Sequence, residues 1–146
     1  MKSRNMGFLL VSTVLLCVLA ASSSAAEKTD TLIVIARLIE IPSKFVPNDL
    51  YNYVYIMKYS ILKVEKGMHA SKELLVGQYN PLIPRNKIKD KMRAFAKGNV
   101  DKFIVGARHR LVLIAPISAV WNYAFQDEYF DYEITKYYAL QTDIAK

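Results

Sequence analysis

The segment at 51–67, YNYVYIMKYSILKVEKG, constrains the fold more than any other part of the chain. It is rich in tyrosine, valine and isoleucine and contains no proline, which is the composition of a long β-strand. Gly67 can end the strand in a turn, because glycine adopts positive φ without steric cost. A strand of this length is typical of a barrel in which one strand curls across the structure and buries different faces along its length.

Alternation divides this segment into two faces, because successive side chains of a strand point to opposite sides. One face carries four tyrosines: Tyr51, Tyr53, Tyr55 and Tyr59. The other carries the more apolar set, interrupted by Lys58 and Ser60: Val54, Ile56, Leu62 and Val64. We predict that the apolar set is the main core face and that the tyrosines pack with tethered hydroxyls. A platform for a ligand is the alternative for the tyrosine face.

Four further segments have strand composition. TLIVIARLIEI at 31–41 is apolar at nearly every position, as expected of a strand that is buried on both faces or wrapped inside a closed barrel. KELLVGQY at 72–79 contains Gly77, which predicts a bulge or bend. The last two predicted strands cover 109–115 and 131–142.

The pattern changes at 86–98, NKIKDKMRAFAKG. Ile88, Met92 and Phe95 recur at helical spacing among basic residues, so we predict one amphipathic helix whose apolar face seals the barrel. Asn86 is its expected N-cap and Gly98 its expected C-terminal stop.

The predicted order is three strands, a helix and two strands, which is the order of the OB-fold. The predicted fold is therefore mainly β: a five-stranded OB-like Greek-key barrel with one amphipathic helix between strands 3 and 4. An open antiparallel sheet with one helix is the alternative.

The first residues predict export. Lys2 and Arg4 precede an apolar run at 6–21 and a small-residue stretch that ends at Ala26, as in a secretory signal peptide. We therefore predict a signal peptide at 1–26 and a single OB-like domain at 27–146, secreted or periplasmic, with no transmembrane segment. The mature chain then holds 18 basic and 13 acidic residues, and it loses Cys17, the only cysteine. Without disulfides, the domain must rely on its apolar core.

Four quoted stretches resemble a known group: YIMKYSILKVEKG, KELLVG, FIVGARHRLVLIAP and YYAL. Together they are similar to small exported bacterial OB-like domains and, more distantly, to the netrin-like domains of metalloproteinase inhibitors. The resemblance covers roughly residues 31–142 and implies the barrel fold. Some of those bacterial domains accompany surface-polysaccharide acetylation or export, which implies a role at the cell envelope. Those inhibitors act through an N-terminal cysteine, which the mature chain lacks, so that activity is not implied here.

The residues that usually carry catalysis are scattered. His69 and His109 lack the neighbours of a metal site, and no serine stands in a nucleophile elbow, so we expect neither metal nor cofactor and place an enzyme last. Four acids gather near the C-terminus, and we expect a solvated acidic rim there rather than a calcium site, because the spacing of a calcium loop is missing. They are Asp127, Glu128, Asp131 and Glu133.

The segment at 85–110 is strongly basic, with nine cationic residues against Asp90 and Asp101. Its expected patch consists of Arg85, Lys87, Lys89, Lys91, Arg93, Arg108 and Arg110, with Lys97 and Lys102 beside them. In an exported protein such a patch favours acidic glycans, lipid headgroups or an acidic protein surface over nucleic acid. A solvated face without a partner is the alternative.

Aromatic side chains mark a second candidate site on the predicted loops. In an OB-fold the ligand lies between the loop after strand 1 and the loop joining strands 4 and 5. Flat side chains there suit a sugar ring or a pocket on a partner protein. The candidates are Phe45, Trp121, Tyr123 and Phe125. We predict an exported, non-catalytic binding module for an envelope glycan or protein partner; the alternative is an accessory or inhibitor-like protein that docks onto an acidic protein or membrane surface through 85–110.

Overall fold

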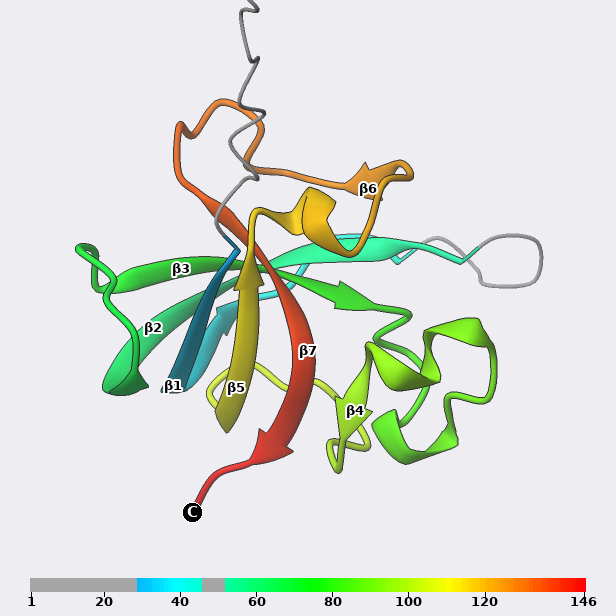
Figure 1. The fold of residues 1–146 in the computed structure, drawn as a ribbon. Coiled ribbons are helices and arrows are strands. Elements are labelled where there is room, and N and C mark those ends of the chain that lie inside the picture. Colours follow the sequence, from blue (N-terminus) through cyan, green and yellow to red (C-terminus); the bar gives the residue numbers. More distant parts are fainter. Residues whose placement is uncertain (1–28, 46–51) are drawn as a thin grey trace, which may run out of the picture.

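The structure is a computed structural model that describes residues 29–45 and 52–146 (Figure 1). The predicted signal peptide at 1–26, with Cys17, and Tyr51 lie outside these residues. Within the described part, no helix is long and apolar enough to cross a membrane.

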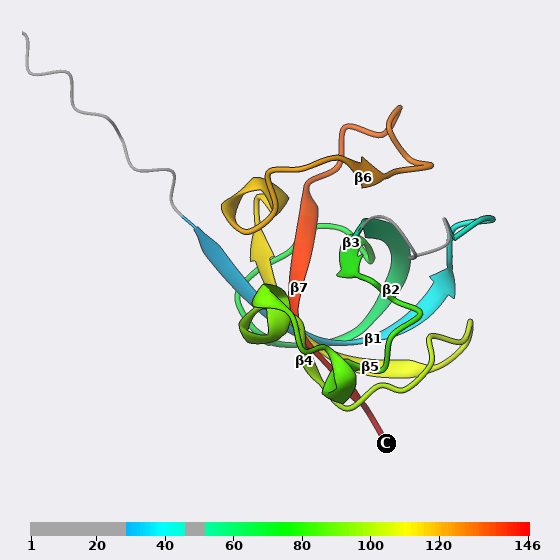
Figure 2. The ribbon, with the colours of Figure 1, turned by 90° about the vertical axis from the view of Figure 1, so that its right-hand side faces the viewer.

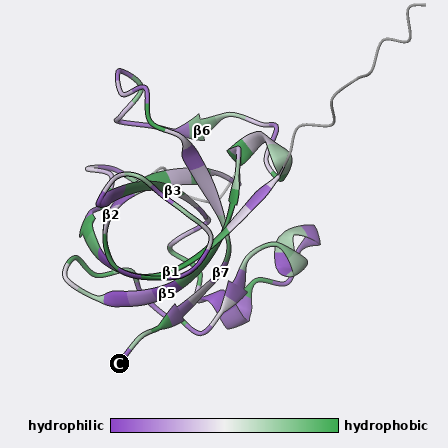
Figure 3. Ribbon diagram, turned by 60° about the vertical axis from the view of Figure 1, so that its left-hand side comes forward, coloured by the Kyte–Doolittle hydropathy of each residue, from purple (hydrophilic) through white to green (hydrophobic). Residues whose placement is uncertain are grey.

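Five long strands form a closed barrel (Figures 1 and 2). The strand order is β1-β5-β7-β3-β2, and a pairing between β1 and β2 closes the ring, as Figure 3 shows. Neighbouring strands are antiparallel, except that β3 and β7 run parallel. Closure confirms the predicted mainly-β barrel and contradicts the open-sheet alternative. The strands are β1 (Asp30–Glu40), β2 (Val54–Lys66), β3 (Glu73–Tyr79), β5 (Arg108–Ala115) and β7 (Lys136–Ile144).

The barrel interior is filled by side chains from all five strands. Strand β1 alternates strictly, with Leu32, Val34, Ala36 and Leu38 all buried and their neighbours half-buried or exposed. Leu111 and the rest of the inward row of β5 lie beside these residues on the neighbouring strand. Burial of such apolar side chains is the main source of stability, at about 25 cal/mol per Å² of apolar surface.

Strand β2 corrects the predicted division of faces. Met57 and Tyr59 point into the barrel, whereas Leu62 and Val64, which we assigned to the core face, are 48% and 40% exposed. The reason is that this face of β2 points away from the barrel interior, and a second apolar cluster covers it only at its start, at Val54 and Ile56. Leu62 lies beyond that cover and is left open to solvent, and the register shifts in the β1–β2 pairing interrupt the alternation of β2 only after Ile61.

A second apolar cluster, here called the outer core, covers one outer side of the barrel. Its strand residues include Val54 and Ile56, so the start of β2 is buried on both faces. The connections at 80–96 and 117–134 supply the covering side chains. Gly77 sits beneath this cover, where a Cβ would come within 2.7 Å of Ile117 and Val54, so it allows close packing rather than marking a bulge. The outer core comprises Val54, Ile56, Leu75, Tyr79, Ile88, Met92, Ala96, Ile117, Trp121, Tyr129 and Tyr138.

The predicted helix at 86–98 is replaced by two 3₁₀ turns, η1 (Arg85–Lys87) and η2 (Lys91–Ala94). Ile88 is extended and separates the turns, with ψ of 119°. The Asp90 carboxylate accepts a hydrogen bond from the Met92 N–H at 2.8 Å and starts η2 there. Aspartate competes in this way for backbone donors and favours caps over helix interiors.

The predicted cap residues and apolar face change accordingly. Asn86 lies inside η1, which follows Pro84, and Gly98 pairs with β7 in the short strand β4 (Lys97–Gly98) instead of ending a helix. Met92 is buried, as predicted, together with Ile88, but Phe95 is 44% exposed. The remaining elements are the 3₁₀ turn η3 (Ile117–Ala119) and the strand β6 (Phe125–Gln126), which pairs with the start of β2.

Candidate functional site

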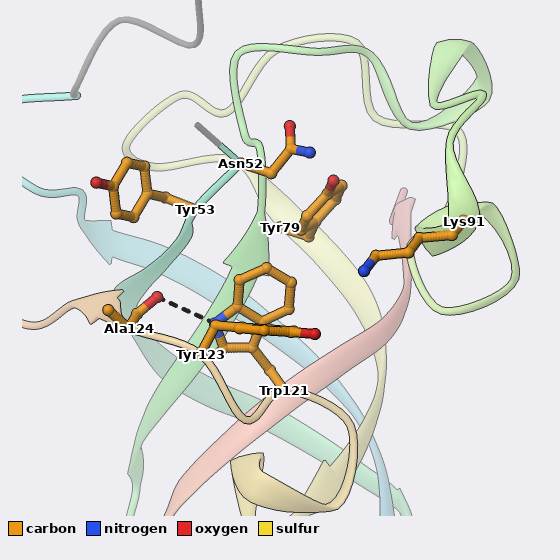
Figure 4. A pocket seen from close by; sticks show the side chains of 7 residues that line it. All are labelled: Asn52, Tyr53, Tyr79, Lys91, Trp121, Tyr123 and Ala124. Carbon is orange, nitrogen blue, oxygen red and sulfur yellow. Dashed lines mark hydrogen bonds between the residues drawn. The ribbon is translucent and has the colours of Figure 1, made fainter. Parts of the chain in front are cut away.

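A cleft of about 380 Å³ lies between two connections that are distant in sequence (Figure 4). One connection leads from η3 to β6, and the other follows β3 and contains η1 and η2. The start of β2 closes the third side. The lining residues are Asn52, Tyr53, Tyr79, Lys91, Trp121, Tyr123 and Ala124.

Trp121 forms the fixed wall of the cleft. Its side chain is only 5% exposed, and its ring centre lies 5.6 Å from that of Tyr79. The indole Nε1–H donates to the Ala124 carbonyl at 3.1 Å, and the backbone N–H donates to the Ile117 carbonyl at 2.9 Å. The first of these bonds fixes the orientation of the ring, and the second fixes the backbone that carries it.

Tyr123 provides the accessible aromatic surface. It is 64% exposed, and its ring centre lies 5.1 Å from that of Trp121 at an interplanar angle of 64°. The Lys91 Nζ lies 5.4 Å from the centre of the Tyr123 ring, which is cation–π distance. Figure 4 shows the lysine reaching toward the two aromatic rings from the opposite connection.

Tyr79 connects the barrel to η2. Its hydroxyl donates to the Asp90 Oδ2 at 2.6 Å, and the other carboxylate oxygen caps η2. Burial, together with the hydrogen bond and charge of Asp90, raises the pKa of Tyr79 well above its usual value of 10.0. Tyr79 therefore stays a protonated donor, and the turn that carries Lys91 is tied to the end of β3.

A pair of asparagines shapes the rim beside Tyr53. Asn80 has a positive φ of 37°, a conformation that asparagine tolerates better than most residues. Its side chain accepts from the Tyr53 N–H at 3.1 Å and donates to the Asn52 Oδ1 at 2.8 Å. These bonds fix the turn after β3 against the two residues that precede β2.

The structure brings together only part of the predicted aromatic set. Trp121 and Tyr123 share the cleft, whereas Phe125 lies in β6 and packs against the outer core. Phe45 lies elsewhere: its ring centre is 5.0 Å from that of Tyr55, and it lines a separate cavity of about 300 Å³ beside Phe103.

The predicted basic patch is also divided. Arg85 is buried, donates to the carbonyls of Asn80 and Ile83, and lies 5.3 Å from the Phe103 ring centre. Burial lowers its pKa to about 10, which leaves it charged at neutral pH. Arg110 donates to Glu65 at 2.8 Å on the barrel wall. The other predicted members are exposed: Lys87, Lys89, Lys91, Arg93 and Arg108.

The cleft joins two features that the sequence treats as separate, the aromatic loop and the basic segment. Sequence reasoning missed Asn52 and Tyr79 as lining residues, and it assigned Tyr53 only to the tyrosine face. The turn signal Asn80-Pro81 after Tyr79 gave a hint, because residues at strand ends adjoin loops. Nothing in the sequence pairs that strand end with Trp121.

The histidines and the acidic rim have structural partners. His69 contacts the Tyr137 hydroxyl at 3.1 Å. Asp127 forms an ion pair with Lys136, and Glu128 accepts a hydrogen bond from the Ser43 hydroxyl. His109 is buried, with its Nδ1 3.2 Å from the Tyr59 hydroxyl. Among the residues of the ranges 29–45 and 52–146, no group of three or more histidine, cysteine or acidic side chains is placed to hold a metal ion.

No family model, curated protein or solved structure matches this chain. What the cleft can bind therefore follows from its own geometry. That geometry comprises a fixed indole, an exposed tyrosine, an amide and one ammonium group around a small concave space.

Proposed function

We propose that this chain is an exported, non-catalytic binding module that holds a glycan of the cell envelope in the aromatic cleft. The single observation that carries the proposal is the arrangement of Trp121 and Tyr123 beside Asn52 and Lys91. Sugar rings present apolar C–H faces and a rim of hydroxyls, so they need a flat aromatic surface beside a few polar groups. The cleft offers both, and its volume of about 380 Å³ is within the range of small-molecule sites.

The position of the cleft supports an OB-like assignment of the barrel. In OB-folds the connection between the last two barrel strands borders the ligand. Here that connection, between β5 and β7, carries both Trp121 and Tyr123. The cleft lies against the barrel, so its walls rest on a rigid frame.

A non-catalytic role is supported by the state of the reactive side chains. His109 is enclosed in the barrel, and His69 is held between Tyr137 and the Glu73 carbonyl. Neither histidine lines the cleft. The signal-peptide composition of residues 1–26 supports export, and N-terminal sequencing of the exported form should find a start near Glu27.

The second candidate is docking onto an acidic protein or membrane surface through the segment at 85–110. The observation that favours it is a run of exposed cations on the turns beside the cleft. Docking of this kind requires no aromatic contact, so Tyr123→Ala should leave it intact while weakening glycan binding.

The test is binding of purified envelope polysaccharides and a panel of neutral and acidic oligosaccharides, measured by calorimetry. Tyr123→Ala should weaken the interaction about fivefold or more, because stacked aromatic contacts contribute about 1 kcal/mol or more each. Phe130→Ala is the matched control: Phe130 is more exposed than Tyr123 but does not line the cleft. Equal effects from the two variants, or no saccharide binding at all, would contradict the proposal.

A further inference from the structure

We infer that the cleft selects saccharides that carry an acidic group, and that Lys91 is the residue that selects them. This inference rests on the proposed glycan-binding function. Its starting point is the charge of the lining: Lys91 is the only charged residue among the seven that line the cleft. A neutral sugar would leave that ammonium group without a counter-charge, whereas an acidic sugar would supply one.

Lys91 is held over the cleft, although its side chain is exposed. It is the first residue of η2, which Asp90 caps and which the Tyr79 hydroxyl ties to β3. Its Nζ lies over the Tyr123 ring. A sugar that rests against Tyr123 therefore has its substituents within reach of the ammonium group.

No acid in the described part of the chain forms an ion pair with Lys91. The ion pairs among these residues join Lys58 with Glu40, Arg110 with Glu65, and Lys136 with Asp127. The neighbouring Asp90 uses its two oxygens to accept from Tyr79 and Met92. A charge-assisted bond to Lys91 is thus left for a ligand, and such bonds are shorter and stronger than neutral ones.

The surroundings of the cleft add to the attraction. Against the one negative charge of Asp90, the turns and β4 expose five cations, so this surface carries a net charge of +4. Summed fields of this kind raise the local concentration of anionic ligands. The five cations are Lys87, Lys89, Lys91, Arg93 and Lys97.

The class of ligand follows from the chemistry of lysine. Its ammonium is a compact point charge without the planar fork that makes arginine specific for bidentate geometry. Lys91 therefore recognises the negative charge and does not by itself separate a carboxylate from a sulfate. The expected ligand is an anionic saccharide, either a uronic acid or a sulfated sugar, with its ring against Tyr123 and its acidic group at Nζ.

The experiment compares acidic oligosaccharides with neutralised forms of the same chains. The probes are an oligogalacturonate with its methyl ester, an oligomannuronate with its methyl ester, and a sulfated oligosaccharide with its desulfated form. The wild-type protein should bind at least one acidic form about tenfold or more tightly than its neutral match, since one charge-assisted contact is worth at least about 1.4 kcal/mol. The preferred pair identifies the acidic group.

Two variants test whether Lys91 is responsible for the preference for acidic saccharides. Lys91→Gln should remove the preference for the acidic form, whereas Lys97→Gln, which removes a charge of the same surface outside the cleft lining, should keep it. Tyr123-dependent binding without a preference for the acidic form would overturn this inference and leave the proposed function intact. Equal losses from the two lysine variants would also overturn it, because a diffuse basic surface would then be responsible. Absence of any Tyr123-dependent binding would overturn both.

Discussion

The ring of Trp121 lies against that of Tyr79, with 5.6 Å between the ring centres, so the wall of the cleft is also part of the outer core. A substitution at Trp121 therefore changes the cleft and the core together, whereas one at Tyr123, which is 64% exposed, changes the cleft alone. This contrast makes the two residues distinguishable by measurements on the free protein.

Trp121 should emit at short wavelength and be protected from iodide, because only 5% of it is exposed. Trp121→Ala should destabilise the domain by about 3–5 kcal/mol, the usual cost of removing a large buried aromatic side chain. Tyr123→Ala should leave the free energy of unfolding nearly unchanged. Urea denaturation followed by circular dichroism measures both, and a solvent-exposed Trp121 with a fully stable alanine variant would contradict the structure.

The connection at 85–96 gives a second test. Met92 is buried in the outer core, whereas Phe95 is 44% exposed. Met92→Ala should therefore cost about 2–5 kcal/mol, and Phe95→Ala clearly less, although phenylalanine is the larger side chain. Thermal unfolding of the two variants decides between the 3₁₀ turns and a continuous amphipathic helix, in which Phe95 would be the more costly loss.

The barrel strands were largely predictable from the sequence. Strand β1 was expected at 31–41 and lies at Asp30–Glu40. A segment this rich in β-branched residues favours a strand over a helix. The helix was not predictable from spacing. Ile88 and Met92 are buried as a helical pattern requires, but the Asp90 cap and the tie from Tyr79 divide the segment. A local hydrogen bond therefore overrides the apolar period.

The faces of β2 and the composition of the cleft were less accessible to sequence reasoning. Alternation separates Tyr59 from Leu62, as predicted, but it does not tell which face of β2 points into the barrel, and here the tyrosine face does. The cleft depends on long-range pairing: Tyr79 ends β3, Trp121 follows β5, and both strands pair with β7. Each partner was a recognisable strand end or loop aromatic, but their contact is a property of the barrel.

His109 predicts a loss of stability in mild acid. Burial lowers its pKa from 6.5 to about 4 in the folded protein. Between these two values the unfolded chain binds a proton at His109 that the folded chain does not. The contribution of His109 to stability is therefore fully present above pH 6.5 and is lost as the pH decreases toward 4. A shift of this size corresponds to roughly 3 kcal/mol.

The measurement is urea denaturation of the wild type and His109→Gln at several pH values between neutrality and pH 4. Glutamine does not titrate and retains a group that can bond to the Tyr59 hydroxyl. The wild type should lose more stability than the variant over this range, since the acidic residues contribute equally to both. Parallel pH dependences would show that His109 is not the group responsible.

Gly98 and Gly106 form a matched pair for the last prediction. Both have positive φ, of 127° and 92°, so alanine at either position costs about 1–2 kcal/mol in backbone strain. The surroundings differ: a Cβ at Gly98 would overlap the backbone of Thr142, whereas a Cβ at Gly106 would meet nothing within 4 Å. Gly98 pairs with Thr142 in the β4–β7 ladder, and the Thr142 side chain bonds to the buried Gln78 at 3.0 Å.

Gly98→Ala should therefore separate β4 from β7 and destabilise the domain well beyond the strain cost, while Gly106→Ala should show the strain alone. Chemical denaturation of the two variants gives the difference, and equal losses would mean that β4 does not pack against β7 as closely as the structure has it.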